Sequence, residues 1–248
     1  MGSSLAANEI QGNCYQLSED DLKIQTPARI ILSGPSSSGK SFMIRRLAEN
    51  IDKIFNTKFE TVIYVYPESM YEVQKDYIAK LGEFIPNLIA IEGLDNVNFD
   101  VLTQDNTPKL LILEDLMMEI GNHKLGASLC SRWSHHFSIT YIITVQNYFW
   151  NSKFSQELRR NTTELFLYRD RADLTVLSVI ARKKFKSCPN LLLDAMEWME
   201  NQRISRPDQY LLIESNPLSK LPKEFGVRTN ILPNEKGDIE PIVFTCKK

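Results

Sequence analysis

The feature that most constrains this chain is a stretch that fits the pattern G-x-x-x-x-G-K-S/T at every fixed position, Gly34-Pro35-Ser36-Ser37-Ser38-Gly39-Lys40-Ser41. A short apolar run typical of a strand, residues 29–33, precedes it, and residues 42–51 carry apolar side chains at helical spacing. A phosphate-binding loop requires this order of strand, loop and helix. A chance Gly/Ser turn would need both the motif and its context to arise by accident, so the sequence predicts a polyphosphate site.

The motif assigns roles to individual groups. Backbone N–H groups of the loop and of the helix N-terminus present partial positive charge to a polyphosphate. We expect Lys40 to reach the β- and γ-phosphates and the Ser41 hydroxyl to ligate Mg²⁺. The predicted nucleotide-binding residues are Gly34, Pro35, Ser36, Ser37, Ser38, Gly39, Lys40, Ser41 and Phe42.

Repeated apolar runs predict the fold class. Short β-branched or aromatic runs, typical of buried strands, occur at residues 29–33, 61–66, 88–92, 109–113, 139–145, 164–168 and 210–214. Helical patterns occur at residues 41–54, 68–81, 154–160, 174–182 and 190–200. This alternation is typical of βαβ units. We therefore predict an α/β fold, a three-layer P-loop NTPase sandwich with a central, mostly parallel sheet and helices on both faces.

Length and composition bound the organisation of the chain. Its 248 residues, 43% hydrophobic and 24% charged, suit one large soluble domain. We expect an N-terminal tail over residues 1–26, a core over 27–215, and an extension over 216–248 that packs on the core or is partly mobile. The net charge is −2, so any nucleic acid would need basic residues gathered on one surface.

Cysteines and apolar runs bear on the compartment. The four cysteines contain no C-x-x-C pair, so we expect ordinary thiols in a reducing compartment, without a zinc site or a disulfide framework, at Cys14, Cys130, Cys188 and Cys246. No apolar run approaches the length of a membrane span, and no secretory signal pattern is present. We therefore expect an intracellular protein without a membrane anchor.

Two acids, Glu114 and Asp115, directly follow the apolar run at residues 109–113. Ligands of open α/β sheets bind at the carboxyl ends of the strands, so the pair is placed as a Walker B pair would be. One acid of such a pair holds Mg²⁺, and the other orients or deprotonates the attacking water. We assign Glu114, together with Ser41, to the metal and Asp115 to the water. The usual order is Asp then Glu, so the division of labour stays open, and a solvated acidic pair that caps a strand is the alternative.

Two further candidates follow in the chain. Gln146 ends the run at residues 139–145, and its amide could donate to the γ-phosphate and accept from the water, or it could cap a turn. Arg159 is expected to neutralise phosphoryl charge, supplied from a neighbouring subunit. Each arginine could instead be an ordinary surface residue, and four others compete with Arg159 for this role, namely Arg132, Arg160, Arg169 and Arg171.

The densest basic run is Arg182-Lys183-Lys184-Phe185-Lys186. It could face a nucleic-acid backbone, or it could be a solvated helix end. The pair His135-His136 lacks further ligands at suitable spacing, so we interpret it as structural rather than as a metal site.

The order of several segments resembles the genome-packaging ATPases of the FtsK–HerA superfamily, in particular those of Maverick/Polinton elements, adintovirus-like viruses and, more distantly, poxviruses. The similarity covers residues 27–185. The phosphate loop is generic, but the order of four other segments is specific: Glu92-Gly93-Leu94, Glu114-Asp115-Leu116-Met117, Ser134-His135-His136 and Val145-Gln146-Asn147.

This resemblance implies a RecA-like ATPase of the ASCE division with ATP and Mg²⁺ as cofactors. It also implies a homo-oligomeric ring, a pentamer or a hexamer, that drives double-stranded DNA into a capsid, with capsid or portal-vertex proteins as partners. The host nucleus, the host cytoplasm or the virion would be its location. By position, Lys40 and Ser41 bind nucleotide and metal, and Glu114 and Asp115 stand where relatives carry Asp-Asp. Gln146 is the polar sensor, and the trans-acting arginine aligns poorly with Arg159.

Other classes of P-loop protein remain as alternatives. A nucleotide kinase would carry an Arg-rich lid, which the sequence lacks, and Glu114-Asp115 suits water activation better. A regulatory GTPase would carry an Asn-Lys-x-Asp motif, which is absent from the chain. A non-catalytic structural or regulatory subunit that binds nucleotide stays open.

Overall fold

A nine-stranded sheet organises the computed structural model, which describes residues 19–129, 136–170, 174–202, 209–221 and 226–245. Six neighbouring strands run parallel, in the spatial order β3 (Leu88–Glu92), β2 (Thr61–Tyr66), β4 (Lys109–Leu113), β5 (Ile139–Val145), β1 (Arg29–Ser33) and β6 (Glu164–Tyr168). Antiparallel strands then continue the sheet, namely β7 (Tyr210–Glu214), β8 (Val227–Thr229) and β9 (Ile242–Val243). The parallel part places the carboxyl ends of β1, β4 and β5 at one edge of the sheet.

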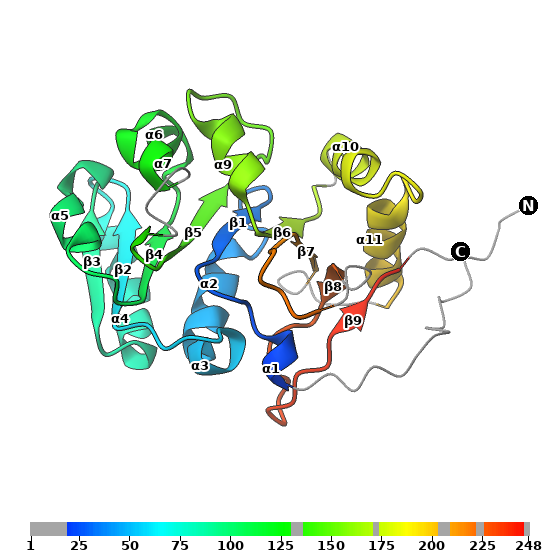
Figure 1. Ribbon diagram of the computed structural model, residues 1–248, viewed down its shortest axis with the longest axis horizontal. Coiled ribbons are helices and arrows are strands. Elements are labelled where there is room, and N and C mark those ends of the chain that lie inside the picture. The colour runs from blue at the N-terminus through cyan, green and yellow to red at the C-terminus, as the bar shows by residue number, and fades with distance from the viewer. Residues whose placement is uncertain (1–18, 130–135, 171–173, 203–208, 222–225, 246–248) are drawn as a thin grey trace, which may run out of the picture.

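Helices cover both faces of the sheet (Figure 1). One face packs against α2 (Lys40–Glu49), α3 (Ile51–Ile54) and α4 (Tyr71–Phe84). The other packs against α5 (Phe99–Thr103), α6 (Met117–Asn122), α7 (Lys124–Ser128), α9 (Ser155–Asn161), α10 (Thr175–Lys184) and α11 (Leu191–Asn201). Two short elements complete the described chain, α1 (Glu19–Leu22) and the 3₁₀ turn η1 (Leu94–Asn96). The predicted three-layer α/β architecture is confirmed.

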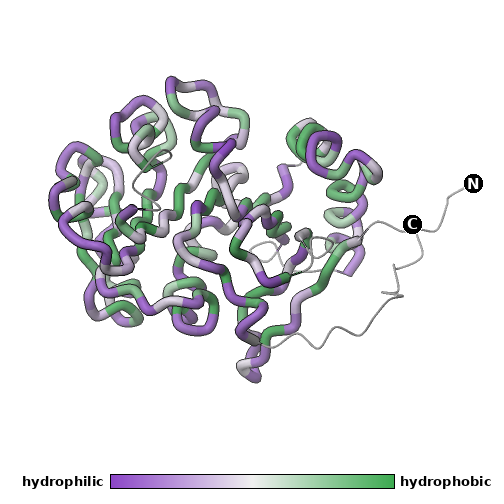
Figure 2. The backbone as a smooth tube through the Cα atoms, viewed as in Figure 1, coloured by the Kyte–Doolittle hydropathy of each residue, from purple (hydrophilic) through white to green (hydrophobic). Residues whose placement is uncertain are grey.

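The central strands are apolar on both sides because each face of the sheet is covered. In β4, Leu110 and Ile112 pack into the core beside α2 to α4, whereas Leu111 and Leu113 pack into the core on the other face. All four are at most 2% exposed. Figure 2 shows the same pattern, with hydrophobic strands inside and hydrophilic helix faces outside. Each such side chain contributes roughly 1.5–3 kcal/mol of burial free energy, which makes β4 a firm support for the acids that follow it.

All seven predicted strands form, with the predicted bounds. The predicted helix over residues 41–54 is divided into α2 and α3 at Asn50, whose φ of −124° lies outside the helical range. The helix predicted from residue 68 begins at Tyr71, because Ser69 has a positive φ of 60°. β8 and β9 were not predicted, since two or three residues are too few to show a period.

Several expectations concern residues outside the central sheet. Cys188, the one cysteine among the described residues, is disulfide-bonded, so the expectation of a thiol at this position is wrong.

Ile24 lies in the core, where its N–H donates to the carbonyl of Ile54 at 2.7 Å. Within the described part of the chain, no helix is long and apolar enough to cross a membrane. The predictions for the N-terminal residues 1–18 and for Arg132, His135 and Arg171 lie outside the described residues.

Candidate functional site

The phosphate-loop motif occupies the turn between β1 and α2, at the carboxyl edge of the sheet. Ser37 and Gly39 have positive φ values of 62° and 108°, which turn the chain into the helix. At Gly34, a Cβ atom would lie 2.5 Å from the Cβ of Tyr168, so the loop can pass this close to β6 only without a side chain. No side chain caps the start of α2, and its first turn carries no acid. The first N–H groups of α2 are therefore open to an anion.

The ammonium group of Lys40 lies inside the loop. Its Nζ donates hydrogen bonds to the carbonyl oxygens of Gly34, at 2.6 Å, and Pro35, at 2.8 Å. Burial lowers the pKa of Lys40, while the charges of Asp115 and Glu114 oppose that shift. A desolvated cation surrounded by carbonyls and two nearby acids would gain a further partner from a polyphosphate.

Glu114 lies at the end of β4, buried beneath the start of α2. Its carboxylate accepts hydrogen bonds from the Ser41 hydroxyl and, at 2.7 Å, from the Tyr64 hydroxyl. Tyr77 of α4 donates to the Ser41 carbonyl at 2.7 Å, which holds the same turn of α2. Burial raises the pKa of Glu114, and its two hydroxyl donors limit the rise. The pair of Ser41 and Glu114 is thus a preformed oxygen-rich corner.

Asp115 has the opposite surroundings although it is the next residue. It is exposed, its φ is +54°, and its backbone N–H donates to Thr144 Oγ1 at 2.9 Å. This hydrogen bond fixes the turn after β4 against β5. The side chain lines a cavity of about 250 Å³ whose other walls are Ser36, Ser37, Gly39, Lys40, Ser41, Phe42 and Glu114.

The cavity suits a triphosphate and Mg²⁺. Its walls carry loop and helix N–H groups, an ammonium, a hydroxyl and two carboxylates. The Ser38 hydroxyl is buried without a hydrogen-bond partner among the described residues, so the loop retains an unsatisfied polar group. Mg²⁺ is usually held by one or two carboxylates together with substrate phosphates. Ser41 and Glu114 meet that requirement, and no cluster of three or more His, Cys, Asp or Glu side chains within the described ranges suggests an all-protein metal site.

Gln146 lies beside the loop but does not line this cavity. It is exposed at the end of β5 and lines a separate hollow of about 20 Å³, together with Ser33, Gly34 and Tyr168. The N–H of Gly34 donates to the carbonyl of Val145 at 3.1 Å, which connects the loop to the residue before Gln146. A role as a γ-phosphate sensor stays a prediction.

The candidate arginines lie outside the cavity. The Arg159 guanidinium donates to the carbonyl of Trp150 at 2.8 Å, and burial lowers its pKa. Arg160 is exposed on the same helix, and Arg169 forms an ion pair with Glu200. Within this chain none of these arginines reaches the phosphate loop, so a contribution of Arg159 to a neighbouring subunit stays a prediction.

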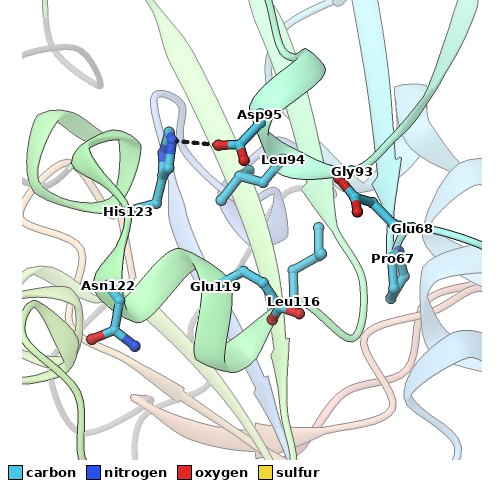
Figure 3. A pocket seen from close by; sticks show the side chains of 9 residues that line it. All are labelled: Pro67, Glu68, Gly93, Leu94, Asp95, Leu116, Glu119, Asn122 and His123. Atoms are coloured by element: carbon cyan, nitrogen blue, oxygen red, sulfur yellow. Dashed lines mark ion pairs between the residues drawn. The ribbon is translucent and has the colours of Figure 1, made fainter.

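A second, larger cavity of about 490 Å³ lies at the carboxyl ends of β2, β3 and β4 (Figure 3). Its walls include the carboxylates of Glu68, Asp95 and Glu119, and the His123 Nε2 lies 3.1 Å from an oxygen of Asp95. The Nδ1 of His123 accepts from the N–H of Leu125, so Nε2 carries the proton that points to Asp95. Three carboxylates would repel a polyphosphate, so the smaller cavity is the better nucleotide site despite its size.

Three supporting residues were not predicted, Tyr64, Tyr77 and Thr144. Each contributes through a hydrogen bond to a residue more than 25 positions away: Tyr64 to Glu114, Tyr77 to Ser41, and Thr144 to the N–H of Asp115. The one signal in the sequence is a tyrosine inside an otherwise apolar strand, since a buried hydroxyl needs a partner.

Comparisons with known proteins add distant structural likeness to this geometry. No protein-family model and no curated protein matches the chain. Among solved structures, the cytoplasmic domain of EssC matches with a TM-score of 0.41 and 12% sequence identity, over 61% of this chain and 32% of that one. The chain thus spans about a third of the length of that structure. The description of the site therefore rests on its own residues.

Proposed function

We propose that the chain hydrolyses ATP in the phosphate-loop cavity and uses the reaction to move double-stranded DNA. One observation carries the enzymatic part: Lys40, Ser41, Glu114 and Asp115, which come from two distant segments, line a single cavity of about 250 Å³. A grip for phosphates, an oxygen corner for a metal ion and a free carboxylate are the parts that phosphoanhydride hydrolysis requires.

The residues have separate roles in this proposal. Lys40 and the loop N–H groups bind the β- and γ-phosphates, and Ser41 with Glu114 holds Mg²⁺, which when bound neutralises charge that develops on the phosphates. Asp115 orients a water molecule and accepts its proton while the water oxygen bonds to the γ-phosphorus. The bond from that phosphorus to the bridging oxygen breaks, and ADP and phosphate leave.

The unusual order of the two acids is compatible with these roles. Glu114 is 3% exposed and already engaged by two hydroxyl groups, which suits a ligand or anchor. Asp115 is exposed and lines the cavity, so its carboxylate can contact solvent water, which suits a base. The side chain of Glu114 reaches the hydroxyl groups of both Ser41 and Tyr64 from the end of β4.

The motor part of the proposal rests on the order of motifs in the sequence, which resembles genome-packaging ATPases. We propose a homo-oligomeric ring, with capsid or portal-vertex proteins as partners and Arg159 as the candidate residue for a neighbouring nucleotide. In such a ring, phosphate release from ATP would be faster with duplex DNA present.

Substitution of the proposed base tests the enzymatic part. D115N should bind a fluorescent ATP analogue with unchanged affinity, because the loop is intact, and should lose turnover by about 10²–10⁴-fold, because the water loses its base. Phosphate release with and without long duplex DNA is the measurement. E119Q, which removes an exposed acid from the second cavity, is the matched control and should retain wild-type turnover.

Other outcomes point to other functions. Turnover of D115N above about a tenth of wild type would contradict the role of Asp115, since that loss is below the range of a general base. Phosphate transfer that appears only with an added nucleoside acceptor would indicate a kinase. Nucleotide binding without any release of phosphate would indicate a structural nucleotide site.

A further inference from the structure

An exposed aromatic ring with two cations beside it lies on the loop between β5 and α9. Phe149 is 36% exposed. The guanidinium carbon of Arg159 lies 5.9 Å from the centre of its ring, and the Nζ of Lys183 lies 5.7 Å from it. The three residues come from the loop, from α9 and from α10, so tertiary packing alone brings them together. We call this group the Phe149 cluster.

Among the described residues, neither cation of the Phe149 cluster has a carboxylate partner. No described carboxylate forms an ion pair with Arg159 or Lys183, and the Arg159 guanidinium donates only to carbonyl oxygens. By contrast, Arg45 and Lys75, on the helices of the opposite face, each pair with a glutamate. Two unpaired cations held close together produce a local positive potential on a chain whose net charge is −2.

The geometry also indicates how a ligand would be contacted. Because two cations lie within 6 Å of the ring, the ring is not a free platform for stacking of a base. The ring orders the side chain of Lys183, whereas Arg159 lies nearer to the Trp150 ring, at 5.3 Å, and donates to the Trp150 carbonyl. Ordered cations with no carboxylate partner suit the regularly spaced phosphates of a nucleic-acid backbone. Such contacts are independent of the base sequence.

We propose that the Phe149 cluster binds the phosphate backbone of nucleic acid, with Phe149 as a positioning residue for Lys183. In this arrangement Arg159 contacts nucleic acid, which is the alternative to its proposed contact with a neighbouring nucleotide. The role of this surface as the track contact of a motor rests on the proposed function, but its binding of nucleic acid does not require hydrolysis. Phe149 follows Gln146 by three residues in the same loop, so the surface is directly connected to the strand end beside the phosphate loop.

Binding of a fluorescein-labelled DNA duplex without nucleotide, measured by anisotropy over about 50–200 mM salt, tests the proposal. K183Q should bind more weakly and should reduce the slope of log K against log salt by about 0.9, the value for one phosphate contact. F149L should weaken binding about two- to fivefold, as loss of an exposed cation–π contact would, whereas F149Y keeps the π-face and should bind as wild type. K80Q, an exposed lysine of α4 on the opposite face, should leave the slope unchanged.

Equal salt slopes for wild type, K183Q and K80Q would overturn the proposal. Equal affinities of F149L and F149Y would overturn the positioning role of the ring. K40A separates this proposal from the enzymatic one, because it should lose nucleotide binding and keep nucleotide-free DNA binding. Failure of hydrolysis in every variant would therefore leave the DNA result interpretable.

Discussion

Two neighbouring carboxylates, Glu114 and Asp115, have opposite environments at the end of one strand. The turn after β4, with its positive φ at Asp115, directs one side chain into the protein and the other into the cavity. The hydroxyl group of Tyr64, a fully buried residue, donates a hydrogen bond to the buried carboxylate of Glu114. At the scale of single residues, the site therefore depends on a tyrosine that would never touch a nucleotide.

Removal of that hydroxyl should destabilise the protein. Y64F leaves an oxygen of Glu114 without its donor in a buried place, so we expect the free energy of unfolding at neutral pH to fall by about 1–3 kcal/mol. Urea denaturation is the measurement. Y66F is the matched control, because Tyr66 stacks on Tyr64 at 6.0 Å and no hydrogen bond of its hydroxyl appears among the described contacts. Equal losses in the two variants would contradict the importance of the Tyr64 hydrogen bond.

At the scale of elements, the phosphate loop between β1 and α2 passes very close to the neighbouring strand β6. At Gly34 an added Cβ would meet the Cβ of Tyr168 at 2.5 Å, and neither backbone can easily withdraw, since β1 pairs with β6 along four residues. The loop is thus shaped as much by the neighbouring strand as by its own glycines.

Because an added Cβ would collide with β6, the substitution G34A should distort the phosphate loop. We expect a loss of about 1–3 kcal/mol in the free energy of unfolding, as for other overpacked sites, together with weaker nucleotide binding. Thermal denaturation and binding of a fluorescent ATP analogue are the measurements. G82A in α4 is the control, because its Cβ would meet nothing within 4 Å and should stabilise the helix by roughly 0.5–1 kcal/mol. A G34A variant as stable as wild type would show that the close approach to β6 is not required.

At the scale of the whole molecule, a buried acid, Glu164, lies where the parallel part of the sheet, ending at β6, meets the antiparallel part, beginning at β7. Glu164 is 1% exposed, accepts hydrogen bonds from Thr163 and Asn216, and lies opposite Glu214 across β6 and β7. Burial is the main cause that raises the pKa of Glu164 to about 8. Glu214 is itself paired with the buried Arg228.

The raised pKa of Glu164 predicts that the stability of the protein depends on pH. Between pH 4.5, the value for an unperturbed Glu, and about 8, the folded protein keeps the proton of Glu164 and the unfolded chain has lost it. The folded state therefore binds more protons, and the free energy of unfolding should decrease as pH rises through this window. E164Q should flatten that decrease, as measured by urea denaturation from pH 5 to about 8. An unchanged slope in E164Q would rule out Glu164 as the source.

Much of the architecture was predictable from local patterns. The five parallel strands β1, β2, β4, β5 and β6 are almost wholly buried, so each appears in the sequence as a mainly apolar run with clear ends, whereas the edge strand β3 is partly exposed. The phosphate loop is defined by spacing, and its position after β1 and before α2 is confirmed. The cluster of Lys40, Ser41, Glu114 and Asp115 also followed from the rule that ligands bind at the carboxyl ends of parallel strands.

The amino-acid sequence by itself thus determined where the seven strands β1 to β7 and the phosphate-loop motif lie, because short-range patterns identify both. Only the tertiary structure decided which acid meets Ser41, 73 residues away, that Tyr64 and Tyr77 support that corner, and that Lys183 lies beside Phe149. It also decided that β8 and β9 extend the sheet. These contacts depend on the order of strands and the directions of side chains across the sheet, and no local period records either of them.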